Sequence, residues 1–348
     1  MEGNYKNQLD SRRINIDKEI SRMKARLERL SPQKLSVDDE FCEVEDTNEI
    51  SINVVSSMSA GKSTFINALL QQKLMPSSNM ACTAKITKIT DNDGKFSVVA
   101  FNKDGDVVAD IDSDVNYGTM QVLNENNTVD YVEIAGNIPF SGTNNAKISL
   151  IDTPGPNNSR DTNHKEFMEQ ELSDLSDNIV VYVISATQFG VKDDARLLDE
   201  LQSKLSNDTK VIFLVNKLDQ IDPREEHVEK VYMDAKEYLL SMGISTKDIY
   251  PISALTALDI RTILNRSELD MDDDEIYDAM AQVRKFNRNI GLHLEKYTSV
   301  SEKIKAKIDL ELKNAVANGD RNKQALIHSG IPTVEARLVE LVNELANK

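Results

Sequence analysis

Short apolar runs recur along the middle of the chain and are separated by amphipathic or polar stretches. The longest runs lie near residues 179–186 and 211–215 and are rich in Val and Ile. Runs of this length and composition are typical of strands that are buried on both faces of a parallel sheet. A membrane-spanning helix needs ~20 apolar residues, so we expect no transmembrane segment in this chain.

Strand and helix patterns alternate from about residue 49 to residue 255. We expect strands at 49–56, 85–89, 96–102, 129–134, 147–152, 178–185, 210–215 and 248–253, and helices from 62 and at 165–176, 193–204 and 225–242. Residues 103–128, rich in Asp, Asn and Gly, are expected to hold a polar excursion with a short helix. This alternation predicts an α/β fold with a mostly parallel central sheet flanked by helices.

Helical patterns flank this core on both sides. The first places apolar residues in a strict heptad seam, which predicts either an amphipathic helix docked on its own domain or a coiled coil. The seam residues are Ile16, Ile20, Met23, Leu27 and Leu30. The expected organisation is an N-terminal amphipathic helix (1–35), an acidic linker (36–48), the core (49–255), a helical insert (256–328) and a final helix (329–348).

The composition is acidic, but the charge is unevenly distributed. The formal net charge is −17, which disfavours a protein whose whole surface binds nucleic acid or anionic lipid. Residues 12–34 carry eight Lys or Arg against three acidic residues, so this segment is +5 and the remainder is −22.

The carboxylates at 270–275 lack the glycine and spacing of a calcium loop and predict a solvated helix start. Two cysteines without metal-ligand spacing and the lack of a signal peptide predict a cytoplasmic protein.

The segment Ser56–Thr64 carries the clearest candidate chemistry. It lies between a β-branched strand and a helix pattern and contains Gly61-Lys62-Ser63. In such a turn the backbone N–H groups and the helix dipole attract phosphate, the lysine reaches the β- and γ-phosphates, and the serine ligates Mg²⁺. Ser56 stands where the G-x-x-x-x-G-K-S pattern has its first glycine. A serine fits there only if the position does not require a positive φ.

Two further elements fit the phosphate and magnesium end of a nucleotide. Thr83 precedes a strand and would close over the γ-phosphate and offer a second oxygen to Mg²⁺. Asp152 ends an apolar strand and would hold the Mg²⁺ shell, and the N–H of Gly155 can approach the γ-phosphate because no side chain intervenes. Taken singly, such a threonine or an Asp-Thr-Pro-Gly turn is also an ordinary structural element.

Two loops near the end of the core fit a guanine base. Asp219, after the buried strand 211–215, can accept hydrogen bonds from N1–H and the exocyclic amine of guanine, a donor pair that adenine lacks. The stem of Lys217 can lie on the base, and Asn216 is expected to tie the loops together. The backbone N–H groups of Ser253 and Ala254 would face the guanine O6.

All of these elements occur at strand ends, where α/β folds bind ligands, and in the order that a GTPase requires. Each element taken singly could be an ordinary turn, but ordinary turns do not explain why all of them occur together and in this order. The sequence therefore predicts a site for GTP or GDP with Mg²⁺, and Asp219 disfavours an ATPase.

The same residues resemble the dynamin superfamily, particularly its bacterial members. The resemblance lies in the loop 59–63, the switch segments 76–78 and 82–85, the segment 185–188 with Asp193-Asp194, and the start of the last helix at 329–332. It covers roughly residues 50–255 and 329–348. It implies a P-loop GTPase domain, with the N-terminal heptad helix as part of a helical neck.

Carried over residue by residue, the resemblance implies three sets of site residues. The nucleotide-binding set is Ser57, Ser59, Ala60, Gly61, Lys62, Ser63, Thr64, Asn216, Lys217, Asp219, Ser253 and Ala254. The metal ligands are Ser63, Thr83 and Asp152, and the catalytic set is Ser59, Lys62, Thr83 and Gly155.

One position departs from the dynamin pattern. Met58 stands where the family commonly has a glutamine that helps to orient the attacking water, and a thioether cannot donate a hydrogen bond. Water orientation would then come from Ser57, Ser59, backbone groups near Thr83 and Gly155, or a partner subunit. Hydrolysis is therefore less firmly predicted than binding, since a missing orienting group slows phosphoryl transfer.

The resemblance also implies partners. Dynamin relatives hydrolyse GTP when two GTPase domains pair across the nucleotide face, and they often remodel membranes. We expect a homodimer of this kind, a stalk or partner dynamin-like subunit, peripheral membrane contact and no nucleic acid. The alternative is a slow GTP-dependent switch or scaffold that acts on protein partners. The chain is expected to be part of a longer protein or a small relative that borrows its stalk.

Overall fold

A computed structural model describes residues 49–57, 59–76, 85–92, 94–113, 115–141, 147–153, 178–205, 209–222, 227–265 and 273–347. The expected helices at 1–35 and 165–176 lie outside these residues, as do Met58, Thr83 and Gly155 among the site residues. Among the described residues, no helix combines the length and apolarity needed to cross a membrane.

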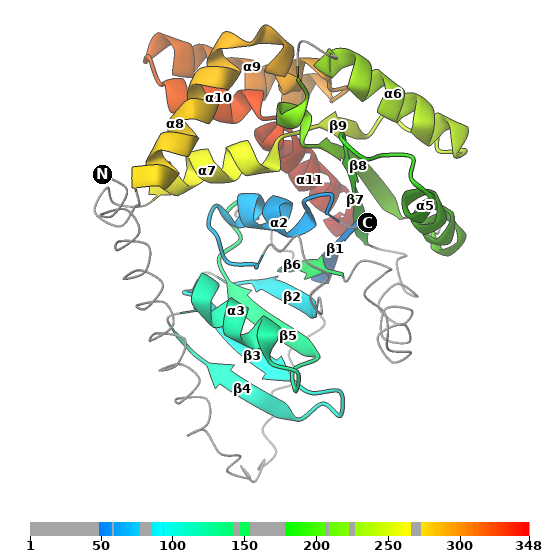
Figure 1. Ribbon diagram of the computed structural model, residues 1–348, viewed down its shortest axis with the longest axis vertical. Coiled ribbons are helices and arrows are strands. Elements are labelled where there is room, and N and C mark those ends of the chain that lie inside the picture. Colours follow the sequence, from blue (N-terminus) through cyan, green and yellow to red (C-terminus); the bar gives the residue numbers. More distant parts are fainter. Residues whose placement is uncertain are drawn as a thin grey trace, which may run out of the picture.

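The centre of the protein is one nine-stranded sheet with the order β4-β3-β5-β2-β6-β1-β7-β8-β9 (Figure 1). The strands are β1 (Glu49–Ser56), β2 (Ile86–Asp91), β3 (Ser97–Phe101), β4 (Val107–Ile111), β5 (Tyr131–Gly136), β6 (Lys147–Asp152), β7 (Ile179–Ser185), β8 (Lys210–Asn216) and β9 (Ile249–Pro251). Five of the eight strand pairs are parallel, which confirms the predicted mostly parallel sheet.

Strand direction determines which loops meet. The strands β6, β1, β7, β8 and β9 run parallel to their neighbours, so the loops that follow them emerge at one edge of the sheet. β2 is antiparallel to β6, and Thr87 near its start pairs with Asp152 at the end of β6. The start of β2 therefore lies at the same edge of the sheet as the ends of β6, β1 and β8.

Around β7, both faces of the sheet are covered by helices. Along β7 the odd-numbered residues from Ile179 to Val183 join a cluster with α2 (Lys62–Leu70) and α11 (Ile331–Ala346). The even-numbered residues from Val180 to Ile184 join a second cluster with α5 (Lys192–Lys204) and α6 (Val228–Ser241). Burial on both faces explains why this strand is apolar at every position from Ile179 to Ile184.

The segment after β9 is helical, as predicted. It comprises α7 (Ala254–Asn265), α8 (Asp273–Arg288), the short 3₁₀ helices η3 (Ile290–Leu292) and η4 (Leu294–Tyr297), α9 (Glu302–Ala317) and α10 (Arg321–His328). Helices α8, α9 and α10 gather at one end of the molecule (Figure 1). The expected boundary between core and insert, at 255/256, falls inside α7. The domain division itself stays a prediction.

One strand was not predicted from the sequence. The polar excursion contains the expected short helix α3 (Tyr117–Glu125), but it also contains the edge strand β4, which pairs with β3 in a hairpin. The signal was the Asp104-Gly105 turn, in which Gly105 has a φ of 84° and favours hairpins. The Asn102 side chain accepts hydrogen bonds from the N–H groups of Asp104 (3.0 Å) and Asp106 (2.8 Å) and fixes this turn.

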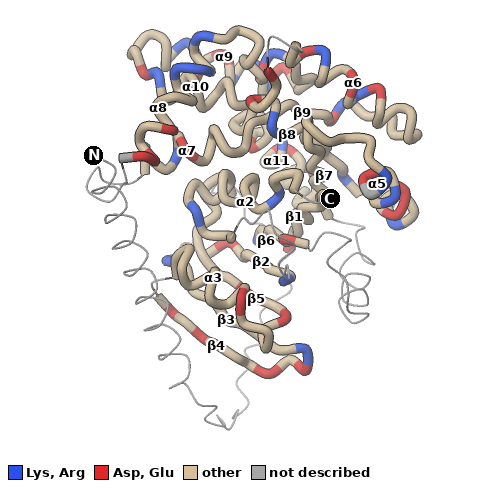
Figure 2. Tube along the Cα trace, viewed as in Figure 1, with Lys and Arg blue, Asp and Glu red and all other residues tan. Residues whose placement is uncertain are grey.

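Charged residues of both signs are interspersed on the helices, and α5 shows Lys or Arg beside Asp or Glu (Figure 2). The predicted helix start among the carboxylates at 270–275 is confirmed for its described part, since α8 begins at Asp273. One of these carboxylates is not merely solvated, because Glu275 forms an ion pair with Lys73 at 2.8 Å.

A buried ion pair joins three helices on one face of the sheet. The Arg261 guanidinium of α7 contacts both carboxylate oxygens of Glu335 on α11, each at 2.7 Å. The same guanidinium donates to the carbonyl oxygen of Ala68 on α2. The last helix is therefore fixed to the helix that follows β1, and removal of either partner would leave buried polar atoms without hydrogen bonds.

We predict that Arg261→Ala lowers the free energy of unfolding by about 3 kcal/mol, because Glu335 and the Ala68 carbonyl lose their donor. Urea unfolding followed by circular dichroism measures this loss. Lys204→Ala is the control, since it removes a more exposed pair with Glu200, and should change the free energy by less than about 0.5 kcal/mol. Equal effects of the two substitutions would contradict the structural role of Arg261.

Candidate nucleotide-binding site

The loop between β1 and α2 has the backbone form of an anion cradle. Ser59 and Gly61 both lie in the left-handed region, with φ of 60° and 96°, and α2 begins at Lys62. Such left-handed turns direct successive N–H groups inward, and the first turn of a helix leaves its own N–H groups unpaired. Ser56 is the last residue of β1 and does not have a positive φ, so the serine fits where the phosphate-loop pattern has a glycine.

Two features require glycine at position 61: the positive φ and the close approach of the Asn216 side chain. A Cβ atom at this position would lie 2.4 Å from Nδ2 of Asn216 and 3.9 Å from Cε of Lys217. Such a distance to Nδ2 is too short for non-bonded atoms. The absence of a side chain at Gly61 therefore lets the loop after β8 rest directly against the loop after β1.

The buried Asn216 side chain joins two loops to each other. Its Nδ2 donates to the carbonyl oxygen of Ala60 at 2.9 Å, and its Oδ1 accepts from the N–H of Ala254 at 3.0 Å. A side-chain amide carries both a donor and an acceptor, which this geometry needs. The prediction that Asn216 ties the loops together is confirmed.

Lys62, Ser63 and Asp152 come together at the start of α2. The Lys62 ammonium contacts Asp152 Oδ1 in an ion pair, and Ser63 Oγ donates to Asp152 Oδ2 at 3.4 Å. Burial lowers the pKa of Lys62 to about 7, while the touching carboxylate favours its charged form. The site thus presents a cation, a hydroxyl and a carboxylate beside the N-terminus of a helix.

Asp219 lies in a short 3₁₀ helix, η1 (Leu218–Gln220), directly after β8. Lys217 adopts a φ of 68°, and this left-handed residue turns the chain from β8 into η1. Asp219 is buried, and its backbone carbonyl accepts a hydrogen bond from the Lys285 ammonium of α8. The 216–219 loop is therefore held from two sides, by the loop after β1 and by α8.

The N–H groups of Ser253 and Ala254, expected to face the guanine O6, have partners within the protein in this structure. The Ser253 N–H donates to the carbonyl oxygen of Ser329 at 2.9 Å, and the Ala254 N–H donates to Asn216. Both groups are buried and therefore use partners within the protein. These residues fix the loop before α7, and neither N–H is free to face a base oxygen.

Lys285 is the residue that the sequence analysis missed. It lies 66 residues after Asp219, and no local pattern marks it as part of the site. The same helix also contacts the segment after α2, through the Lys73–Glu275 ion pair described above. Helix α8 is therefore linked both to the end of α2 and to the 216–219 loop.

The fold and the site together define a class of protein. A strand, a left-handed glycine turn and a helix that begins with Lys62-Ser63 face a strand-end aspartate, and an Asn-Lys-x-Asp loop follows β8. This combination is typical of P-loop GTPases. A model of the dynamin family matches residues 52–218. The matched stretch is just under half of the chain, so the core of this chain is similar to the dynamin family.

Two curated relatives are similar over part of the chain. Dynamin-like protein A of Bacillus subtilis is 23% identical over 203 residues, which are 58% of this chain and 16% of that protein. Clamp-binding protein CrfC of Escherichia coli is 26% identical over 127 residues, which are 36% of this chain and 16% of that protein. The chain thus spans about one sixth of the length of either relative.

Two solved structures are also similar. One is an oligomerised bacterial dynamin pair described in connection with long-range sensing and tethering of membranes. It has a TM-score of 0.47, 20% identity, and coverage of 96% of this chain and 52% of that chain. The other is Era of Aquifex aeolicus bound to GDP and aluminium fluoride. It has a TM-score of 0.37, 21% identity, and coverage of 62% of this chain and 55% of that chain.

We predict that Asn216→Ala loosens the loops around the site even without nucleotide. The Ala60 carbonyl and the Ala254 N–H lose their buried partner, which should lower the free energy of unfolding by about 1–3 kcal/mol. The Ala254 N–H should also exchange with solvent faster, as measured by hydrogen exchange. Asn347→Ala is the matched control, because Asn347 is exposed and bonds only within the end of α11. Unchanged exchange at Ala254 would contradict the role of Asn216.

Proposed function

We propose that this chain binds a guanine nucleotide together with Mg²⁺ and hydrolyses GTP to GDP and phosphate. The observation that carries the proposal is the convergence of two loops on Asn216, which sets the Lys62–Asp152 pair and the Asp219 loop at one edge of the sheet. A nucleotide needs both a phosphate end and a base end. The match of residues 52–218 to the dynamin family model supports the same assignment.

At the phosphate end, Lys62 and the N–H groups at the start of α2 would bind the β- and γ-phosphates. Phosphate is a stronger partner for a buried ammonium than a single carboxylate, because it brings more negative charge and more acceptor oxygens. The contact between Lys62 and Asp152 would thus be exchanged for a contact between Lys62 and the nucleotide.

Ser63 and Asp152 fit a magnesium site. Their oxygens are 3.4 Å apart in the structure, and hydroxyl, carboxylate and water oxygens are the ligands that Mg²⁺ prefers. The ion, when bound, would neutralise phosphate charge. Thr83 is proposed as a further ligand on the sequence pattern alone.

At the base end, Asp219 would accept the two donors of guanine, and the stem of Lys217 would cover one face of the base. The Lys285 contact holds the backbone of Asp219 in place. An adenine would leave the buried carboxylate without donors, and this argues against ATP as the substrate.

The hydrolysis step is the less well supported part of the proposal. Met58 cannot orient water through a hydrogen bond, so Ser57, Ser59, the N–H of Gly155 or a partner subunit would have to do so. Pairing of two chains across the nucleotide face would supply such groups, and peripheral contact with a membrane would be the downstream role. Slow turnover as a GTP-dependent switch or scaffold is the alternative that Met58 favours.

Titration with labelled GDP, GTP and ADP in the presence of Mg²⁺ tests the binding proposal. We expect tight binding of both guanine nucleotides, weak binding of ADP, and loss of binding in Lys62→Ala. Asp219→Asn should weaken GDP binding at least about 100-fold and improve binding of xanthosine diphosphate, whose C2 oxygen can accept from the new amide. The control is Asp199→Asn on the exposed side of α5. Unchanged GDP affinity in Asp219→Asn would overturn the base assignment.

The rate of GTP hydrolysis per molecule, measured against protein concentration, separates the two roles. Assembly-stimulated hydrolysis predicts a rate that rises with concentration, whereas a switch predicts a slow, flat rate. Met58→Gln should raise the rate by about tenfold or more, because an amide can orient water. Met233→Gln, at an exposed methionine of α6, is the control. No gain from Met58→Gln in a chain that dimerises would count against the water-orientation argument.

A further inference from the structure

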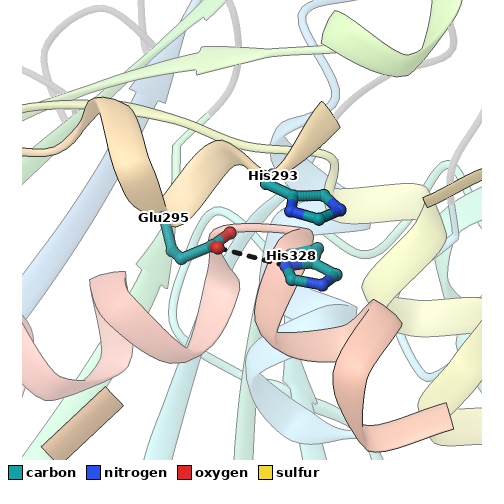
Figure 3. Close-up of side chains that lie close together, drawn as sticks. All are labelled: His293, Glu295 and His328. Carbon is teal, nitrogen blue, oxygen red and sulfur yellow. Dashed lines mark hydrogen bonds and ion pairs between the residues drawn. The ribbon is translucent and has the colours of Figure 1, made fainter. Parts of the chain in front are cut away.

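Two histidines and a glutamate form a compact cluster in the helical segment (Figure 3). His293 connects η3 to η4, Glu295 lies in η4, and His328 is the last residue of α10. The cluster is separate from the residues proposed to bind nucleotide, and the sequence pattern alone gave no indication of it, since His328 lies 33 residues after Glu295.

The three side chains converge. The rings of His293 and His328 stack with centroids 3.6 Å apart and an interplanar angle of 4°. Glu295 Oε1 lies 3.1 Å from His328 Nδ1, the contact drawn in Figure 3. One nitrogen or oxygen from each residue can be chosen so that all three atoms lie within 4.8 Å of one another.

Two of the polar atoms in this cluster have no partner. Within the described part of the chain, His293 Nε2 and Glu295 Oε2 are buried and make no hydrogen bond. The side chains of His328 and Glu295 are each only 6% exposed. A buried polar atom without a partner costs about 1–3 kcal/mol, so a cluster that served only to fill space would be unfavourable.

We propose that His293, Glu295 and His328 bind a divalent transition-metal ion of the Zn²⁺ class. Two imidazoles and one carboxylate form a known three-residue zinc ligand set, with water in the fourth position. Imidazole ligands favour Zn²⁺, Cu²⁺ or Ni²⁺ over Mg²⁺ and Ca²⁺. Two imidazolium ions would repel each other in a stack, so at least one ring is neutral and keeps a lone pair for a metal.

Binding requires a small rearrangement. Ligand atoms in a tetrahedral zinc site lie about 3.3 Å apart, since each bond is about 2 Å, so the side chains would close by up to about 1.5 Å and leave the parallel stack. One cation faces the cluster: Lys296 Nζ lies 3.1 Å from His293 Nδ1. An ammonium only donates, so in this contact Nδ1 accepts and Nε2 carries the ring proton. Coordination of a metal through Nε2 would move that proton to Nδ1 and end the contact with Lys296.

A metal bound at this cluster would affect the backbone segments next to it. His328 directly precedes Ser329, whose carbonyl oxygen accepts from the Ser253 N–H, and Gly330 packs against the backbone of Pro251 with a φ of 79°. A metal that joins η4 to the end of α10 would therefore fix the connection to α11 and the loop that precedes α7. The metal site does not depend on the proposed nucleotide binding.

The test is a titration of the chelator-treated full chain with Zn²⁺, in competition with a chromophoric chelator. We expect one zinc ion per chain, with binding weakened at least tenfold in Glu295→Gln and in His328→Ala. His227→Ala is the matched control, because His227 is an exposed histidine outside the cluster and should leave the binding unchanged. Co²⁺ bound to the native chain should show the visible absorption of a four-coordinate site.

Circular dichroism of the metal-free variants shows whether a substitution weakens zinc binding only because the variant fails to fold. Glu295→Gln preserves the shape of the side chain, so it is decisive if His328→Ala fails to fold. Stoichiometric binding that Glu295→Gln weakens while the fold is retained supports the site. Absence of stoichiometric binding by the native chain would overturn the proposal, and so would binding that Glu295→Gln leaves unchanged.

Discussion

The arrangement of the site depends on one close contact, that of the Asn216 amide with the backbone around Gly61. The amide bridges the Ala60 carbonyl and the Ala254 N–H, and it fits only because residue 61 lacks a Cβ atom. Three loops that are distant in sequence are thereby fixed at one edge of the sheet. Their convergence follows from parallel strand direction, but their spacing follows from this contact.

The helical segment after β9 is connected to the site rather than appended to it. Lys285 of α8 holds the Asp219 backbone, Glu275 of the same helix pairs with Lys73 after α2, and the Arg261–Glu335 pair joins α7 to α11. A movement of the segment after α2 or of the 216–219 loop would therefore be transmitted to α8 through charged contacts. This connection gives a physical route by which the occupancy of the site would change the position of the helices.

The sequence predicted most of the sheet and the residues at its edge, because buried strands and turn glycines leave local patterns. It missed β4, although Asp104-Gly105 offered a hairpin signal, because the polar composition of the excursion concealed a short edge strand. It could not reveal Lys285 or the cluster of His293, Glu295 and His328, since long-range side-chain contacts leave no periodic trace. Nor could it show that the Ser253 and Ala254 N–H groups bond to the carbonyl of Ser329 and the side chain of Asn216.

The most direct test of the central claim, that one edge of the sheet binds both ends of a guanine nucleotide, is a crystal structure of the chain grown with GDP and Mg²⁺. The account predicts phosphate density at the start of α2 against Lys62, metal density near Ser63 and Asp152, and the base beside Asp219. Nucleotide density elsewhere on the molecule, or a base that points away from Asp219, would contradict it.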